Sequence, residues 1–186
     1  LITATGVGPE QVAGTTPGAT FGSIGYIVGS ADNSMVAISA YTGGGFLVIS
    51  DFDNSTGRLA GAPRIDPVSG TYGAAFSSDG AYLYATIFGS SELLQYDLAT
   101  GAPPVRLTLP GPGQAGAITG APDGHMYITR FSQPSITRLI DPLAPLTAAN
   151  LTAGVLAAPG CTYTAGLPNF IASATVAPAV CGDGVV

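Results

Sequence analysis

The sequence predicts an all-β fold made of repeated four-stranded units, and two sets of turn residues carry that prediction. One set recurs at steps of 97 − 53 = 44 and 141 − 97 = 44 residues, and consists of Asp53, Asp97 and Asp141. The other recurs at steps of 79 − 32 = 47 and 123 − 79 = 44 residues, and consists of Asp32, Asp79 and Asp123. A period near 44 residues with about four short strands is typical of a β-propeller blade.

The central unit indicates how each repeat folds. A turn at residues 77–80 precedes an apolar stretch at 81–87 that is rich in β-branched and aromatic residues, the composition that strands favour. A second turn at 88–91 reverses the chain into a partner strand at 92–98. Asp and Gly suit these turns, because Asp hydrogen-bonds its own backbone two residues on and Gly accepts positive φ. We therefore expect a hairpin in the middle of each unit.

The same pattern divides the chain into units near residues 25–69, 70–113 and 114–160. Terminal strands are expected within residues 1–20, where LITATGV (1–7) is the one convincing apolar stretch, and within residues 161–171. Residues 142–160 could hold a short helix or an irregular outer strand, and residues 172–180 have the composition of a linker.

The number of units leaves two architectures open. The 186 residues make a little over four units of 44, and propellers close with about four to eight blades. The chain forms either a compact four-bladed ring or an arc of a larger ring. We favour the arc, because the terminal segments are one or two strands short of a blade of about four strands. Its open edges would then be covered by other protein chains or by missing parts of the same chain.

Composition excludes several classes of protein. The 27 glycines and 15 prolines interrupt the apolar residues, so long helices are not expected, and no apolar run approaches the roughly 18 residues of a membrane span. Only 9% of residues are charged, none is lysine, and the net charge is −6. Binding to a phosphate backbone has almost no electrostatic basis, so nucleic acid is not an expected partner. An acidic, lysine-free chain rich in Ser, Thr and Gly favours an extracellular or cell-surface location.

The ordered motifs carry a resemblance to known surface proteins. GTYGAAFSSDGAYLYATIFGSSELLQYDLATG, GAPDGHMYITRF and CTY…GLPNFI together resemble the propeller segment of gliding-motility-associated surface proteins, over about residues 25–171. That segment is similar in turn to lactonase-like, YVTN-type propellers. The resemblance implies a secreted or surface-attached propeller of unassigned activity. This chain departs from the pattern at His125, where a lysine is usual, and it lacks recognisable flanking blades.

The last six residues carry a second resemblance. CGDGVV (181–186) resembles the start of a cysteine-rich repeat that is common on myxobacterial surface proteins. This implies a parent chain that continues beyond the segment.

No residue is assigned a catalytic, cofactor-binding or metal-binding role. The six repeated aspartates are interpreted as turn caps. His125 is the only histidine, and no acid–base partner stands beside it in the sequence. One histidine and two cysteines cannot supply a zinc site. No G-x-S-x-G nucleophile elbow is present, and we expect no cofactor.

Two covalent modifications are candidates. Cys161 and Cys181 could form a disulfide in an oxidising compartment. Alternatively, Cys181 pairs further along the cysteine-rich repeat and Cys161 is buried or bonded elsewhere. Asn54 and Asn150 lie in N-glycosylation sequons, which we interpret as incidental.

The function predicted from these observations is a non-enzymatic extracellular or cell-surface propeller module for adhesion, scaffolding or surface assembly. One alternative is a lactonase-like propeller hydrolase, which would need acid, His and Arg side chains that converge around a central channel. Another is a carbohydrate-binding module. Most of the fifteen Tyr and Phe residues are expected in the core, and a few could line a rim that binds sugars or peptides.

Overall fold

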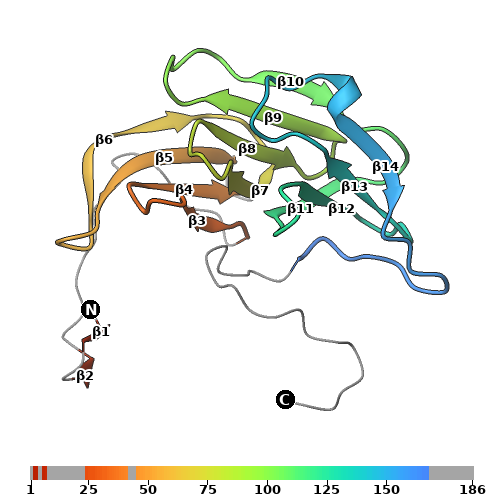
Figure 1. Ribbon diagram of the computed structural model, residues 1–186, viewed down its shortest axis with the longest axis horizontal. Coiled ribbons are helices and arrows are strands. Elements are labelled where there is room, and N and C mark those ends of the chain that lie inside the picture. Colours follow the sequence, from red (N-terminus) through yellow and green to blue (C-terminus); the bar gives the residue numbers. More distant parts are fainter. Residues whose placement is uncertain (1, 4–5, 8–23, 42–44, 168–186) are drawn as a thin grey trace.

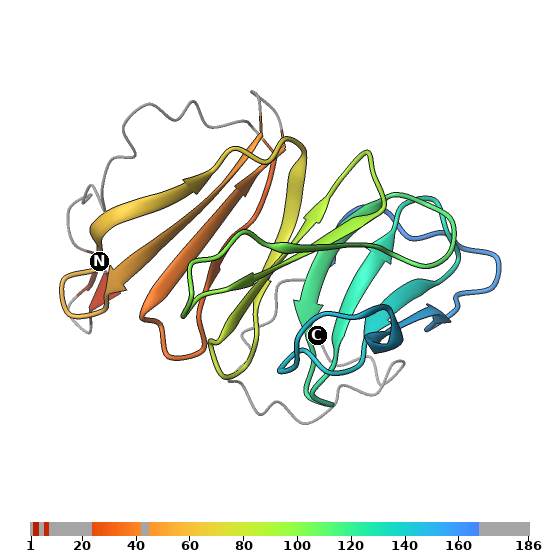
Figure 2. The ribbon, with the colours of Figure 1, turned by 90° about the horizontal axis from the view of Figure 1, so that it is seen from above.

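The protein is all-β in the part that the structure describes. The computed structural model describes residues 2–3, 6–7, 24–41 and 45–167. Three four-stranded antiparallel sheets follow one another along the chain (Figure 1), and from above they stand side by side (Figure 2). The one helical element among these residues is the 3-10 turn η1 (Ala148–Asn150). The all-β prediction is therefore confirmed, and no helix in the described part is long and apolar enough to cross a membrane.

Each sheet is a meander in which the spatial order of strands equals their chain order. Sheet 1 contains β3 (Ile27–Gly29), β4 (Met35–Ala40), β5 (Phe46–Asp53) and β6 (Arg58–Asp66). Sheet 2 contains β7 (Thr71–Phe76), β8 (Tyr82–Ile87), β9 (Glu92–Asp97) and β10 (Val105–Thr108). Sheet 3 contains β11 (Ala115–Gly120), β12 (Met126–Arg130), β13 (Ile136–Leu139) and β14 (Leu151–Val155). The middle hairpins, β4–β5, β8–β9 and β12–β13, occupy equivalent places in the three sheets.

The turns that join the first strand to the second, and the third to the fourth, follow the chemistry expected from the sequence. In all six of these turns a carboxylate Oδ1 accepts the backbone N–H of the residue two positions on, at 2.8–3.1 Å. The six residues are Asp32, Asp53, Asp79, Asp97, Asp123 and Asp141. Each aspartate therefore caps its own turn, in the way that Asx-turns satisfy the backbone.

Two apolar clusters join the sheets. The cluster between sheets 1 and 2 includes the buried side chains of Ala37, Leu47, Ile49, Leu83, Leu94 and Tyr96. The cluster between sheets 2 and 3 includes Tyr84, Leu93, Ile118, Met126, Ile128 and Leu139. Adjacent residues of β8 alternate between the two clusters, because side chains on a strand point to opposite faces in turn. Since full burial of one large apolar side chain is worth about 1.5–3 kcal/mol, this packing dominates the stability of the array.

A repeated hydroxyl links neighbouring sheets near their first strands. Ser39 donates to the Tyr72 carbonyl of the next sheet, and Thr86 donates to the Gly116 carbonyl at 2.5 Å. Thr129 continues the series with a bond of 2.9 Å to the Ala165 carbonyl. Neighbouring backbones approach so closely here that a Cβ on Gly116 would lie 2.6 Å from the same carbonyl oxygen. Glycine is therefore required at this point of the first strand.

Residues 161–167 differ from the expected final strand. Ala165 takes the place that Tyr72 and Gly116 hold in sheets 2 and 3, and its carbonyl also accepts the Ala117 N–H at 2.6 Å. Residues 161–167 nevertheless form no strand. The physical reason is that only scattered backbone bonds hold the segment, among them the Tyr163 N–H to the Gln133 carbonyl at 2.8 Å, whereas a strand needs a continuous ladder.

The other uncertain segments are resolved in part. Residues 142–160 contain both expected alternatives, because η1 leads directly into β14. At the N-terminus, β1 (Ile2–Thr3) pairs with β2 (Gly6–Val7), so the stretch expected as one strand is a small hairpin. The linker at 172–180, the cysteine-rich start at 181–186 and Cys181 lie outside the described residues.

Candidate functional site

The two ends of the sheets carry different residues. Turns between the first and second strands, and between the third and fourth, meet at one end, which carries all six capping aspartates and is called here the Asp end. The opposite end carries five neighbouring aromatic side chains, and we call it the aromatic end. Its members are Tyr26, Tyr41, Tyr72, Phe88 and Phe131.

Phe88 is the centre of the aromatic cluster. Its ring centroid lies 5.3 Å from that of Tyr41, 5.4 Å from Tyr72 and 5.6 Å from Phe131. Tyr26 extends the cluster through an edge contact with Tyr72 at 5.5 Å. Offset and edge-to-face contacts in this range stabilise aromatic pairs by about 0.5–1.5 kcal/mol beyond the area that they bury. The rings therefore support one another as a preformed surface.

Repetition places these rings together. Tyr41, Phe88 and Phe131 each follow the second strand of their sheet directly. Their distances from the preceding turn aspartate are 41 − 32 = 9, 88 − 79 = 9 and 131 − 123 = 8 residues. This spacing was available in the sequence and could have identified the three rim aromatics, which sequence reasoning left unspecified.

The cluster remains open to solvent. Phe131 is 40% exposed, and the other four rings are half-buried. The Tyr26 hydroxyl accepts the Leu167 N–H at 3.5 Å, so the chain after sheet 3 reaches the residue that precedes β3 of sheet 1. Burial raises the pKa of Tyr72, and the neighbouring Tyr26 adds to the shift, so the Tyr72 hydroxyl keeps its proton near neutral pH. Rings with neutral hydroxyls suit a ligand that has apolar faces and hydroxyl groups.

The carboxylates at the Asp end are satisfied within their own turns. Hydrogen bonds from the Ser30 hydroxyl and the Ser34 backbone lower the pKa of Asp32 to about 2, and bonds from Ser55 and Thr56 lower that of Asp53 to about 2. Among residues 24–41 and 45–167, no three His, Cys, Asp or Glu side chains group closely enough to hold a metal ion. The Asp end therefore has the geometry of a set of turn caps.

His125 lies at the same end and faces a carbonyl. Its Nδ1 is 2.5 Å from the Ile140 carbonyl oxygen, and its backbone N–H donates to Asp123. The side chain is half-buried, at the residue before β12. This contact ties two strands of sheet 3 together and gives His125 a local structural role.

The modification candidates lie on the surface. Asn54 is exposed in the turn after β5, and Asn150 ends η1 with its side-chain amide 3.4 Å from the Pro145 carbonyl. Cys161 is exposed. Its proposed partner Cys181 lies outside the described residues, so the disulfide stays a prediction.

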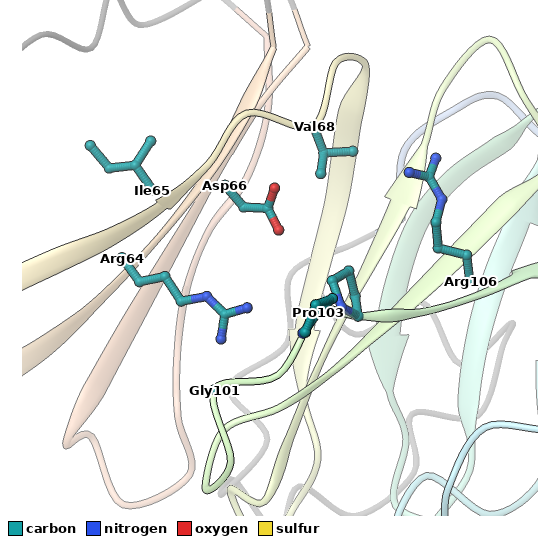
Figure 3. A pocket seen from close by; sticks show the side chains of 8 residues that line it. Arg64, Ile65, Asp66, Val68, Gly101, Pro103 and Arg106 are labelled. Atoms are coloured by element: carbon teal, nitrogen blue, oxygen red, sulfur yellow. The ribbon is translucent and has the colours of Figure 1, made fainter.

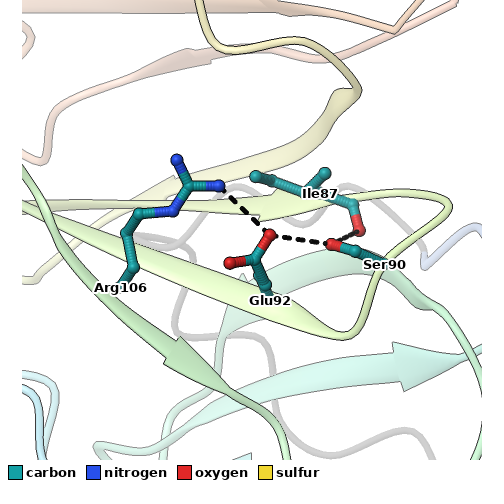
Figure 4. A network of polar contacts seen from close by, with 4 residues as sticks. All are labelled: Ile87, Ser90, Glu92 and Arg106. Carbon is teal, nitrogen blue, oxygen red and sulfur yellow. Dashed lines mark hydrogen bonds and ion pairs between the residues drawn. The ribbon is translucent and has the colours of Figure 1, made fainter.

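An open groove of about 500 Å³ lies between the outer strands of sheets 1 and 2 (Figure 3). Arg64 and Arg106 line it, but both have partners in the protein. Arg64 lies 5.4 Å from the centroid of the Tyr96 ring and donates to the Ala102 carbonyl. Arg106 pairs with Glu92 at 3.1 Å, beside Ser90 (Figure 4). Because both arginines already have partners within the protein, the groove offers less to a ligand than the aromatic cluster does.

Comparisons with known proteins identify a fold and no family. No protein-family model and no curated protein matches the chain. The periplasmic gluconolactonase PpgL of Pseudomonas aeruginosa is similar with a TM-score of 0.56 at 17% identity, over 74% of this chain and 43% of that one. The RRP9 WD40 repeats are similar with a TM-score of 0.52 at 18% identity, over 77% of this chain and 42% of that one. A putative 6-phosphogluconolactonase of Bacteroides uniformis is similar with a TM-score of 0.51 at 18% identity, over 69% of this chain and 40% of that one.

These similarities show the fold alone. The chain spans only 40–43% of each of the three matched chains. WD40 repeats are propeller blades of four strands, and the meanders described above have the same order and pairing. The three sheets of this chain are consecutive β-propeller blades.

Proposed function

We propose that this chain is a non-enzymatic binding module of a β-propeller at an extracellular or cell-surface location, which serves adhesion or surface assembly by holding glycans on its aromatic end. The observation that carries the proposal is the half-exposed cluster of five rings centred on Phe88. The acidic, lysine-free composition supports the location.

The chemistry of the cluster favours a neutral sugar. A sugar ring has an apolar face that packs on an aromatic ring and hydroxyl groups that exchange hydrogen bonds with tyrosine. Tyr26 and Tyr72 supply both functions side by side. Phe88 and Phe131 extend the apolar surface. Large, rigid aromatic side chains commonly dominate the energy of such contacts.

The described residues favour binding over hydrolysis. A lactonase-like site would need acid, His and Arg side chains that converge. His125 and Arg130 lie at opposite ends of β12, and the repeated aspartates cap turns at the end away from the aromatic rings. The fold similarity to gluconolactonases leaves hydrolysis as the alternative function, and the assay below separates the two.

A sugar-binding experiment tests the proposal. Wild-type protein is applied to an array of neutral oligosaccharides and bacterial surface polysaccharides, beside a Tyr72→Ala, Phe88→Ala double variant. Phe52→Ala, which removes a half-buried ring near the Asp end, is the matched control. We expect the double variant to weaken binding by more than about tenfold, the cost of losing an aromatic anchor, and the control to bind as wild type. Turnover of a small lactone with no glycan binding would contradict the proposal and favour the hydrolase.

Assembly is the second part of the proposal. The outer face of sheet 1 carries an apolar cross-strand row, formed by Ile27, Ile38, Val48 and Ile65. Ile27 is 71% exposed and Ile65 is 41% exposed. The outer face of sheet 3 carries a mostly polar row instead, formed by Thr119, Tyr127, Arg138 and Thr152.

This difference predicts association through sheet 1. The faces between the sheets are covered by neighbouring sheets and the outer face of sheet 3 is mostly polar. We propose that another chain covers the exposed ends of the sheet 1 row at Ile27 and Ile65, on either side of the buried Val48. Light scattering at micromolar concentration should then give a mass above the 18.4 kDa of one chain, and Ile65→Lys should restore a single chain. A clean monomer of the unaltered protein would contradict association.

A further inference from the structure

A small cavity at the aromatic end contains an unusual buried cation. The cavity has a volume of about 230 Å³ and lies between the loop that joins sheets 2 and 3 and the outer strands of sheet 3. Its polar lining comes from Arg130, Gln133, Ser135 and Thr137, and prolines and small residues form the remainder. It is separate from the aromatic cluster, although Arg130 and Phe131 are neighbours in the chain.

Only part of the Arg130 guanidinium group is hydrogen-bonded to the protein. Nη2 donates to the Gly111 carbonyl at 2.8 Å and to the Ser91 hydroxyl at 3.3 Å, and Nε donates to the Pro112 carbonyl at 3.1 Å. These neutral acceptors fix the plane of the group. Nη1 makes no hydrogen bond in the described part of the protein. The N–H groups of Nη1 are therefore donors without an acceptor in the described part of the protein.

The charge of Arg130 also has no counter-ion among residues 24–41 and 45–167, where the one ion pair joins Arg106 to Glu92. The residue is only 3% exposed, and burial lowers its pKa. A buried charge without a partner of opposite sign is expensive. Proteins retain such a group where an anion neutralises it.

A second buried donor lines the same cavity. Thr137 is fully buried, and its Oγ1 has no hydrogen-bond partner in the described part of the chain. Buried hydroxyls are almost always satisfied, so two such groups at one cavity indicate a missing polar ligand. The Ser135 hydroxyl and the Gln133 amide border the cavity and could bind further oxygens.

We propose that this cavity binds a small monocarboxylate, with one oxygen on Arg130 Nη1 and the other on Thr137 Oγ1. A carboxylate matches a guanidinium donor closely. A single charge is favoured over sulfate or phosphate dianions, because one arginine supplies one positive charge and the chain carries a net charge of −6. The carboxylate group occupies about the volume of two water molecules, roughly 60 Å³, which leaves room for a body of a few carbons against Pro110, Pro112 and Ala153.

Thermal unfolding in different sodium salts tests the site. Acetate, glycolate and sulfate are each titrated against chloride at constant ionic strength. We expect the melting temperature to rise and saturate with acetate and glycolate, because a ligand that binds the folded state stabilises it by mass action. Sulfate also stabilises proteins without saturating, because it is excluded from their surface, so only the saturating part of the rise counts as binding, and that part should be smaller for sulfate. An equal effect of acetate and chloride would overturn the site, and tighter binding of sulfate would overturn the assignment to carboxylates.

A Thr137→Val variant tests whether acetate binds in this cavity. Because the Thr137 hydroxyl has no hydrogen-bond partner in the described part of the chain, this isosteric change should leave the melting temperature in chloride unchanged or raised. It should weaken acetate binding by about three- to tenfold, the loss of one hydrogen bond. Thr108→Val, on the exposed β10, is the matched control and should bind as wild type. Equal acetate affinity in the Thr137 variant would contradict the proposal.

Arg130→Lys should abolish the saturable rise of the melting temperature with acetate. This variant also loses the contacts to the Gly111 and Pro112 carbonyls. If it does not fold, the result for Thr137→Val tests the proposal instead. Glycan binding by Thr137→Val should be unaffected. The two sites can therefore fail independently of each other.

Discussion

The Asp end and the aromatic end are built from the same repeat, yet they differ in what remains available to a ligand. At the Asp end, each repeated side chain bonds to its own turn, as Asp32 does with Ser34 and Asp79 does with Ala81. At the aromatic end, the repeated side chains contact one another across sheets and keep exposed surface, as Phe88 does with Phe131. Repetition alone therefore does not distinguish structure from function. The distinction lies in whether the repeated group is already satisfied.

Tyr84 and Tyr72 show the same contrast within sheet 2. Tyr84 is fully buried, and its hydroxyl accepts the Gln95 amide and donates to the Pro142 carbonyl. Tyr72 is half-buried and contacts two rings of the cluster. The first residue is a packing group and the second is part of a surface.

The largest expected effect comes from Tyr84→Ala. Removal of this ring opens a cavity between sheets 2 and 3 and leaves the Gln95 amide short of a partner. We expect a loss of about 3–5 kcal/mol in the free energy of unfolding, as for other large aromatic residues. Urea unfolding measures it. Tyr72→Ala should cost far less stability, and a similar loss in both variants would remove the contrast.

Phe88→Ala should affect the ligand more than the fold. The variant removes the ring that joins Tyr41, Tyr72 and Phe131. We expect glycan affinity to fall by about tenfold or more, with a smaller loss of stability than in Tyr84→Ala because Phe88 is half-buried. Isothermal titration and urea unfolding of the same preparation measure the two effects. Unchanged affinity would mean that the cluster packs without binding.

Acid should weaken the Asp end selectively. The pKa of Asp32 and that of Asp53 are lowered from 3.8 to about 2, so the folded state holds the charged carboxylates more strongly than the unfolded chain does. Their contribution is present above about pH 4 and is lost as the pH falls from about 4 to about 2. The melting temperature should drop over that window. An Asp32→Asn, Asp53→Asn double variant should show a shallower drop; an identical slope would contradict the role of these caps.

The smallest effect is expected for His125→Ala. The variant loses the contact with the Ile140 carbonyl at a half-buried position. The melting temperature should fall by less than about 2–4 °C, which corresponds to roughly 1 kcal/mol for a domain of this size, and glycan binding should not change. Loss of a hydrolytic activity in this variant would instead identify His125 as a catalytic group.

The fold could be predicted from the sequence because each turn is determined by residues that are close together in the chain. Asp-Gly turns and alternating strands such as 81–87 depend on neighbouring residues, so hairpins and their order could be derived without a structure. Residues 161–167 were predicted as a strand and form none, because only scattered backbone bonds hold them. Local composition does not report whether a continuous hydrogen-bond ladder is available to a segment.

The sites were harder to predict because they depend on contacts between units. Phe131 and Tyr41 lie far apart in the chain and both contact Phe88. The unsatisfied Nη1 of Arg130 depends on where the Gly111 and Pro112 carbonyls lie. The position of Arg130 relative to these carbonyls does not follow from spacing, whereas the recurrence of an aromatic residue after each second strand was a signal in the sequence.

A residue-resolved binding map tests the central claim most directly. Backbone amide chemical shifts of the 18.4 kDa chain are followed by NMR during titration with an oligosaccharide that binds on the array. The account predicts shifts around Tyr26, Tyr72, Phe88 and Phe131, with the turns at Asp53 and Asp97 unchanged. Shifts centred on the Asp end, with the aromatic end unaffected, would contradict it.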